Sequence, residues 1–165
     1  MKRVLSLVLI LAALLSLSAC LREDDQPEGM AFYYCAARSD YNVGSTALTA
    51  EYRTDVAEDP LQQALERYLD GPVSAELRSP FPEELKLMSA YREGSTVYLT
   101  FSRELTDLSG LELTMACGCL TLTTLALTGA QQVEIRSVSG LLDGQRAITM
   151  DKNTLLLMDT AAEGE

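Results

Sequence analysis

Residues 109–129, SGLELTMACGCLTLTTLALTG, predict a helix that ends near Thr128, where Gly129 stops it. Ser109 and Glu112 stand three positions apart, which is the spacing of a capping box. Five threonines and Glu112 interrupt the apolar residues, and the run falls short of the roughly 20 residues that a membrane-spanning helix needs. The stretch therefore predicts a long helix of a globular domain and not a membrane span.

A polar stripe runs along this predicted helix. Its members lie three or four positions apart and therefore share one side of the helix, whereas Leu111, Met115 and Leu122 lie on a different side. The stripe is uncharged and moderately apolar, unlike the usual exposed face rich in Glu and Lys. Two interpretations remain open: a partly buried helix edge, or a contact face for a second subunit or another partner. The candidate contact residues are Thr114, Cys117, Thr121, Thr124 and Thr128.

Another helix is predicted within residues 59–72. Asp59 suits the N-cap and Pro60 the first helical position. Gly71 and Pro72 end the helix. The apolar residues fall on one helical face: Leu61, Ala64, Leu65, Tyr68 and Leu69. Since Leu65 lies at the centre of this face, we expect Leu65→Asp to unfold the domain.

The other ordered stretches predict β-strands. Aromatic and alternating apolar residues favour these strands, and the turn pair Glu93-Gly94 predicts a β-hairpin. In the first strand of this hairpin we expect Leu85, Leu87 and Tyr91 on one side. The predicted strands are residues 31–36, 47–53, 85–92, 96–101, 132–138 and 154–158.

These elements predict an α+β fold. Apart from the last short strand, they follow in the order strand, strand, helix, strand, strand, helix, strand. Two helices are expected to pack on one face of a mixed β-sheet. The chain has 165 residues, which suits one domain with a sizeable core.

The N-terminus predicts a bacterial lipoprotein signal. Lys2 and Arg3 precede an apolar run, and residues 17–20, LSAC, resemble a lipobox. In lipoproteins the cysteine receives a diacylglyceryl group, and two acyl chains anchor a protein stably. A short N-terminal anchor and an ordinary secretory signal are the alternatives. Cys20 is the predicted lipidation site, which places the protein on the extracytoplasmic face of the cell membrane.

Lipidation at Cys20 predicts four segments of the chain. Residues 1–19 form the signal peptide, and residues 20–30 form the lipidated cysteine with an acidic tether. Residues 31–160 form the folded domain, and residues 161–165 form a frayed tail.

Composition narrows the classes of function. A formal net charge of -11 disfavours nucleic acid and direct docking on anionic lipid head groups. The chain contains no His, which excludes Ser-His-Asp triads and His-dependent zinc sites. Cys117 and Cys119 diverge by about 200° at helical spacing, so we expect no metal and no cofactor. Cys35 and Cys119 are able to oxidise only if the first strand and the long helix face each other.

Several short motifs of the chain occur in a characteristic order: Asp59-Pro60 with Leu61, Leu65 and Leu69, then Gly71-Pro72, Ser79-Pro80 with Pro82, Leu99-x-Phe101-Ser102 with Leu105, and Val133-x-Ile135. In this order, and together with the lipobox, they resemble the GerMN domain of sporulation and germination lipoproteins. The resemblance covers about residues 31–144. It implies an α+β fold related to ring-building motifs of secretion assemblies, without catalysis or cofactor. The germination and sporulation protein carries two such domains in tandem, whereas this chain has room for one.

Three functions follow as hypotheses. The first is a non-enzymatic, lipid-anchored interaction or scaffold module in sporulation, germination or envelope assembly, with a protein partner or a second copy. The second is a binding module for a small ligand or a peptidoglycan fragment. The third is a cell-wall hydrolase that uses Glu83 and Glu84, or Asp55 with Glu58 and Asp59. A cleft lined with Tyr and paired carboxylates favours the second or third, and a flat surface favours the first.

Overall fold

The computed structural model describes residues 27–37, 47–56 and 59–154, and its strands form two sheets. The first sheet has three strands in the order β2-β1-β3, and the second has four in the order β4-β5-β6-β7. The strands are β1 (Met30–Ala36), β2 (Leu48–Arg53), β3 (Leu77–Arg78), β4 (Leu87–Glu93), β5 (Thr96–Phe101), β6 (Gln132–Ser137) and β7 (Ile148–Asp151).

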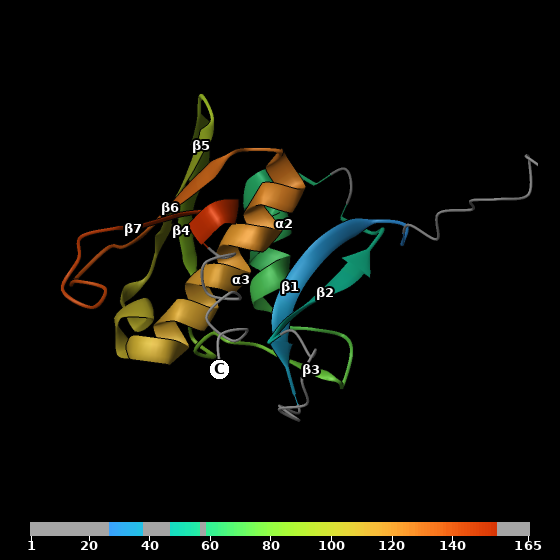
Figure 1. Cartoon of the computed structure of the whole chain (residues 1–165), viewed down its shortest axis with the longest axis horizontal. Helices are drawn as coiled ribbons and strands as arrows, with labels where there is room; N and C mark the ends of the chain where they lie inside the picture. Colours follow the sequence, from blue (N-terminus) through green and yellow to red (C-terminus); the bar gives the residue numbers. More distant parts are fainter. Residues whose placement is uncertain (1–26, 38–46, 57–58, 155–165) are drawn as a thin grey trace, which may run out of the picture.

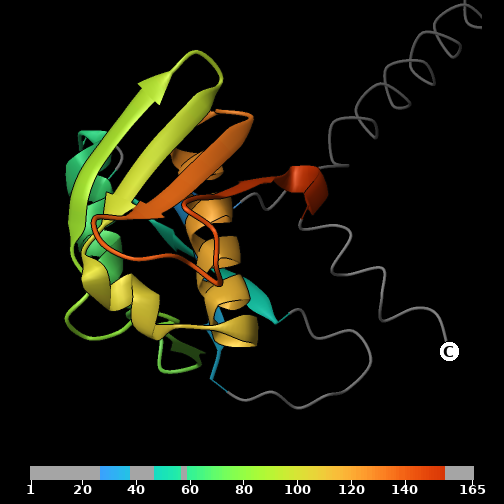
Figure 2. The same cartoon turned by 90° about the vertical axis from the view of Figure 1, so that its left-hand side faces the viewer.

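Two helices lie between the sheets, as Figures 1 and 2 show: α2 (Leu61–Leu69) and α3 (Gly110–Thr128). A short 3-10 helix, η2 (Arg103–Asp107), precedes α3. By length and composition α3 is apolar enough to cross a membrane, but more than half of its most apolar window is buried inside the fold. It is therefore the central core helix of the described domain.

The four-stranded sheet is mixed, as predicted. Strands β4 and β5 form the antiparallel hairpin, and β5 pairs with β6 in parallel. A parallel pair needs a crossover connection, and η2 with α3 provides it. Strand β7 then pairs with β6 in the antiparallel direction.

The core takes side chains from both sheets and both helices. Burial of a large apolar side chain contributes about 1.5–3 kcal/mol, so these residues dominate the stability of the fold. Leu65 is buried at the centre of the α2 face, as its spacing predicts. Among the largest fully buried side chains are Phe32, Tyr34, Leu65, Tyr68, Leu99, Phe101, Leu113, Leu120 and Ile135.

The predicted α+β class is confirmed, but the prediction of a single sheet is wrong. Within the described residues β1 pairs only with β2 and β3, because α2 and α3 separate it from β4–β7. The last strand is also earlier than predicted: β7 ends at Asp151 and Thr154 belongs to a helical turn. Residues 155–158 of that predicted strand lie outside the described part of the chain.

The predicted start of α3 at Ser109 is confirmed, but its capping box is not formed, and the predicted Asp59 cap of α2 is wrong. Ser109 is the N-cap residue of α3, but its side chain makes no capping hydrogen bond. Instead Gly110 N–H donates to Asp143 Oδ2 at 2.9 Å, which places a carboxylate at the positive end of the helix dipole. Asp59 does not cap α2, whose N-cap residue is Pro60. The Asp59 carboxylate lies 3.4 Å from Arg67 Nε instead.

The predicted facing of Tyr91 is wrong as well. A β-bulge between Leu87 and Ser89 shifts the register of β4 by one residue. Leu87 therefore stays with Phe101 on the buried side, whereas Tyr91 pairs with Tyr98 on the outer side. A regular strand would have placed Leu87 and Tyr91 on the same face.

Candidate functional site

The polar stripe of α3 is an interior feature of the folded chain. Thr121 and Thr124 have 0% exposure, and Cys117 is buried beside them. Only Thr114 and Thr128, near the two ends of the helix, are partly exposed. The predicted contact face is therefore wrong, because the sheets enclose the middle of the helix on this side. The alternative interpretation, a buried helix edge, describes the stripe better.

Thr123, which is outside the stripe, completes the part of the β1 edge that the two-residue strand β3 leaves unpaired. Tyr33 N–H donates to Thr123 Oγ1 at 2.9 Å, and Tyr33 C=O accepts from Tyr68 Oη at 2.5 Å. In an antiparallel pair, every second residue of a strand directs its backbone N–H and C=O to the partner strand. Ala36 N–H donates to Ala47 C=O on the β2 side. Tyr33 is three residues from Ala36, so its backbone groups point away from β2. Side chains of α3 and α2 thus replace a missing neighbouring strand at this edge.

A second polar network attaches the loop after α2 to the first sheet. The Arg53 guanidinium pairs with Glu51 Oε1 at 2.6 Å, and it also donates to Tyr34 Oη at 3.1 Å and Gly71 C=O at 2.7 Å. Glu51 Oε2 accepts from the backbone N–H groups of Val73 and Ser74. Three N–H donations of Arg53 and both carboxylate oxygens of Glu51 have protein partners, so the network is structural.

A pair of aromatic side chains lies on the outer face of the four-stranded sheet, whose backbone Figure 2 shows. Across its strands, Tyr91 pairs with Tyr98, Tyr98 with Glu134, and Glu134 with Thr149. We call this row of four residues the tyrosine face. The Tyr91 and Tyr98 rings stack with centroids 5.1 Å apart and planes 15° apart. Tyr91 remains 51% exposed, and Met88 at the bulge remains 55% exposed.

The tyrosine face has the composition of a protein contact surface. Tyr and Met are enriched at the centres of protein interfaces, and a stacked pair of rings offers rigid apolar area at low entropic cost. Glu134 forms an ion pair with Arg136 on the same strand, which leaves a polar border beside the rings. A partly apolar sheet face with a polar border suits a second macromolecular surface.

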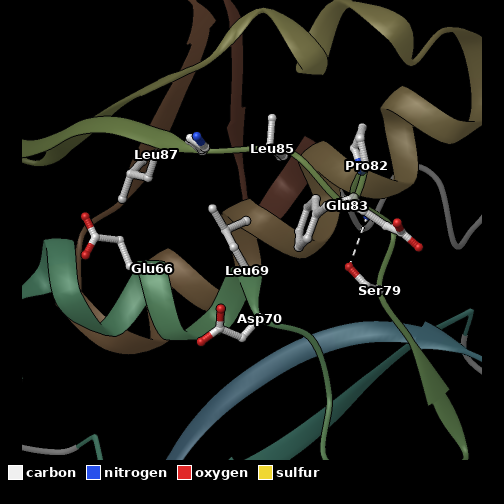
Figure 3. A pocket seen from close by; sticks show the side chains of 10 residues that line it. Glu66, Leu69, Asp70, Ser79, Pro82, Glu83, Leu85 and Leu87 are labelled. Carbon is white, nitrogen blue, oxygen red and sulfur yellow. Dashed lines mark hydrogen bonds between the residues drawn. The ribbon is translucent and has the colours of Figure 1, made fainter.

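A hollow of about 600 Å³ lies between α2 and the segment that leads into β4 (Figure 3). Leu69, Leu85 and Leu87 form its apolar part, and Glu66 and Glu83 lie towards its two ends. In Figure 3 these two carboxylates point in opposite directions. A glycosidase needs two carboxyl groups that face each other across a cleft, so this arrangement does not favour hydrolysis.

The other carboxylates considered for hydrolysis have structural neighbours or no defined position. Asp55 Oδ2 and Asp59 Oδ2 lie 3.3 and 3.4 Å from nitrogens of Arg67. Glu84 is exposed next to Glu83, and Glu58 lies outside the described residues. A second hollow, of about 540 Å³, is lined by Arg136, Ser137, Gly140, Leu141, Arg146 and Ala147.

The three described cysteines are buried and free, and the described residues contain no cluster of metal-ligating side chains. Burial raises the pKa of the Cys117 thiol to about 12, and the Asp143 carboxylate acts in the same direction. The Cys35 and Cys119 thiols share a hydrogen bond, which lowers the pKa of Cys35 and raises that of Cys119. Cys117 therefore stays a protonated core residue, whereas Cys35 and Cys119 form a pair.

Comparison with known proteins gives the family. The Germane family, described as "Sporulation and spore germination", matches residues 31–146. The chain belongs to this family. No curated protein matches its sequence.

Three solved structures resemble this Germane-family chain. The tandem GerMN domains of the sporulation protein GerM from Bacillus subtilis match with 17% identity and a TM-score of 0.53, over 78% of this chain and 46% of that one. The first GerMN domain of the same protein matches with 18% identity and a TM-score of 0.48, over 74% of this chain and 94% of that one. A putative lipoprotein from Clostridium perfringens gives 15% identity and a TM-score of 0.49, over 75% and 87% of the two chains. The tandem structure shows that the fold is shared.

Sequence reasoning missed the tyrosine face of this Germane-family domain. The alternation of Val97, Leu99 and Phe101 already places Tyr98 on the outer side of β5. The bulge that brings Tyr91 beside it has no recognisable residue signal in the chain. Cys20, the predicted lipidation site, lies outside the described residues and stays a prediction.

Proposed function

We propose that this Germane-family chain is a non-enzymatic interaction or scaffold module of sporulation, germination or envelope assembly. A diacylglyceryl group on Cys20 holds it on the extracytoplasmic face of the cell membrane, and residues 21–29 act as a tether, since Met30 begins β1. The tyrosine face binds a protein partner. The stacked pair of the exposed Tyr91 and the partly buried Tyr98 is the observation that carries the proposal, because such a pair on the outer face of a sheet suits a protein surface.

The charge of the chain agrees with this role. A formal charge of -11 keeps the domain away from anionic head groups, so the lipid and not the protein surface makes the membrane contact. The outer sheet face then stays available to a neighbour in the same compartment. Interface affinity usually depends on a few aromatic and Arg residues near the centre of the contact. Tyr91 and Tyr98 are the aromatic residues that the tyrosine face offers for this role.

A crosslinking pull-down with the membrane-anchored protein tests the proposal. We expect the double variant Tyr91→Ala/Tyr98→Ala to recover at least about tenfold less of the partner protein, as loss of interface aromatics typically does. Tyr52→Ala is the matched control, because Tyr52 is 44% exposed on β2 of the other sheet. Equal recovery by both variants contradicts the assignment of the face.

A small ligand or a peptidoglycan fragment is the second candidate. The hollow beside α2 favours it, because its lining carries three carboxylates, those of Glu66, Asp70 and Glu83, against one cation, Lys86. Such a recess fits a ligand with an amino group. Recovery of cell-wall fragments alone in the pull-down, reduced by Glu83→Gln and not by the tyrosine variants, supports this second function over the first.

A further inference from the structure

Strand β1 and helix α3 contact each other in a defined register. One contact is the 2.9 Å hydrogen bond from Tyr33 N–H to Thr123 Oγ1. From Tyr33 to Cys35 the strand advances by two residues, or about 6.6 Å. From Thr123 back to Cys119 the helix covers four residues, or about 6 Å. The two steps match, so a strand and a helix that run in opposite directions bring Cys35 and Cys119 together.

The thiols agree with this register. Cys35 and Cys119 are both buried, and each thiol is close enough to shift the pKa of the other. Cys117 is two positions from Cys119 in the same helix, and therefore points to a different side by about 200°. Its thiol belongs to the main core beside residues of the four-stranded sheet. The geometry separates one pair of thiols from the third.

The electrostatics of the pair suit thiol chemistry. The hydrogen bond from Cys119 lowers the pKa of Cys35, and the Arg78 guanidinium acts in the same direction against the effect of burial. The thiolate is the nucleophile in thiol–disulfide exchange. Cys35 is thus the first attacking group, and Cys119 is the thiol held next to it.

We propose that Cys35 and Cys119 are a modification site: they close to a disulfide that fastens β1 to α3 when the chain meets an oxidant of the disulfide class. This proposal goes beyond the interaction role and does not depend on it. Strand β1 follows the predicted tether directly, so the bond attaches the first strand of the domain to its central helix.

The exchange balances in two steps. The Cys35 thiolate attacks one sulfur of the oxidant's disulfide, which forms a mixed disulfide and releases the oxidant's other sulfur as a thiolate. That thiolate takes the proton of Cys119, and the Cys119 thiolate then attacks Cys35 Sγ and expels the second oxidant sulfur. The second released thiolate takes the proton that Cys35 had lost to solvent. Two protein thiols are oxidised to one disulfide, and the oxidant's disulfide is reduced to two thiols.

Mass spectrometry of the full chain, purified in detergent and refolded with oxidised glutathione, tests the proposal. After alkylation of the remaining thiols and digestion, we expect a linked peptide pair that joins Cys35 to Cys119. Cys117 is expected to carry the alkylating reagent, as a free thiol does. The modification state of Cys20 is read from the peptide that contains it. Because the bond closes a loop of about 80 residues, we expect the melting temperature to rise by at least about 5 °C over the reduced protein.

Two variants make the result decisive. Cys117→Ala retains the Cys35–Cys119 link and the rise in melting temperature, because it removes only the uninvolved thiol. Cys119→Ala loses both, and its Cys35 carries glutathione or alkylating reagent instead. A reduced Cys35 and Cys119 after refolding in oxidised glutathione, or a link through Cys117, overturns the proposal. Neither outcome bears on partner binding by the tyrosine face, so failure of one proposal is distinguishable from failure of the other.

Discussion

Thr123 and Thr124 are neighbours in α3, and both are buried, but their hydroxyl groups differ in their partners. Thr123 Oγ1 accepts the hydrogen bond of Tyr33 N–H, whereas Thr124 Oγ1 has no partner among the described residues. A backbone N–H buried without an acceptor costs about 1–3 kcal/mol. A buried hydroxyl without a partner also costs free energy. Replacing it with a methyl group of similar size is therefore nearly neutral or stabilising.

We therefore expect Thr123→Val to lower the free energy of unfolding by about 1–3 kcal/mol. Thr124→Val is the matched control, and its free energy of unfolding is expected to stay within about 1 kcal/mol of the original or to rise. Urea denaturation of both variants measures the difference. Equal losses in the two variants would show that Thr123 does not complete the edge of β1.

The ion pair of Glu51 and Arg53 gives a pH dependence. Burial alone raises the pKa of Glu51, but hydrogen bonds from Ser74 N–H and the Arg53 guanidinium outweigh burial and bring the pKa below its ordinary value of 4.5. A carboxyl group with a lowered folded-state pKa stabilises the fold fully above its unfolded-state pKa. This stabilisation disappears as the pH falls through the lower pKa of the folded state.

Between about pH 5 and about pH 2, we expect the free energy of unfolding to fall more steeply in the original protein than in Glu51→Gln. The variant has no carboxyl group to titrate at this position and is less stable at neutral pH. Urea midpoints measured across the acid range give the comparison. Parallel pH profiles for the two proteins contradict the inferred role of Glu51.

At the scale of elements, α3 decides which side chains are available to a partner. Its polar stripe lies inside, and the exposed positions of the helix include Leu111 and Ala126. The sequence pattern shows correctly that the stripe shares one side, but not which side the sheets cover. Nearly every side of this helix is apolar or weakly polar, so periodicity alone does not select the buried side.

We expect Thr121→Arg to abolish cooperative unfolding, because it places a charge at a fully buried position. Ala126→Arg is the control in the same helix, since Ala126 is exposed. Thermal unfolding followed by circular dichroism distinguishes them. A folded Thr121→Arg protein that has lost only its partner would restore the contact-face interpretation.

The elements themselves were largely predictable from local sequence. Leu61–Leu69, Gly110–Thr128 and the β4–β5 hairpin follow from apolar spacing and turn residues close to the observed bounds. Strand β3, with two residues, carries no periodic signal. The division into two sheets depends on long-range pairing of β1 with β3, which local patterns do not encode. The cap by Asp143 was missed for the same reason, because it comes from a distant loop.

At the scale of the whole molecule, the outer face of the four-stranded sheet differs from three polar groups that support the fold. The threonines, the cysteine pair and the Arg53 network all lie in the interior or against it. Of the stacked tyrosines on the four-stranded sheet, Tyr91 is exposed and Tyr98 is partly buried. Membership of the Germane family agrees with the resemblance inferred from ordered motifs, although none of these motifs identifies a contact residue. The lipid anchor at Cys20 stays a prediction of the N-terminal pattern.

Site-specific photo-crosslinking tests the central claim most directly. A photoreactive phenylalanine analogue replaces Tyr91 in the membrane-anchored protein within its own cells, and the same analogue replaces Tyr52 in a parallel strain. We predict a discrete protein adduct from position 91 and none from position 52. Absence of a protein adduct at position 91, or equal adducts at both positions, contradicts the claim that the tyrosine face binds a protein partner.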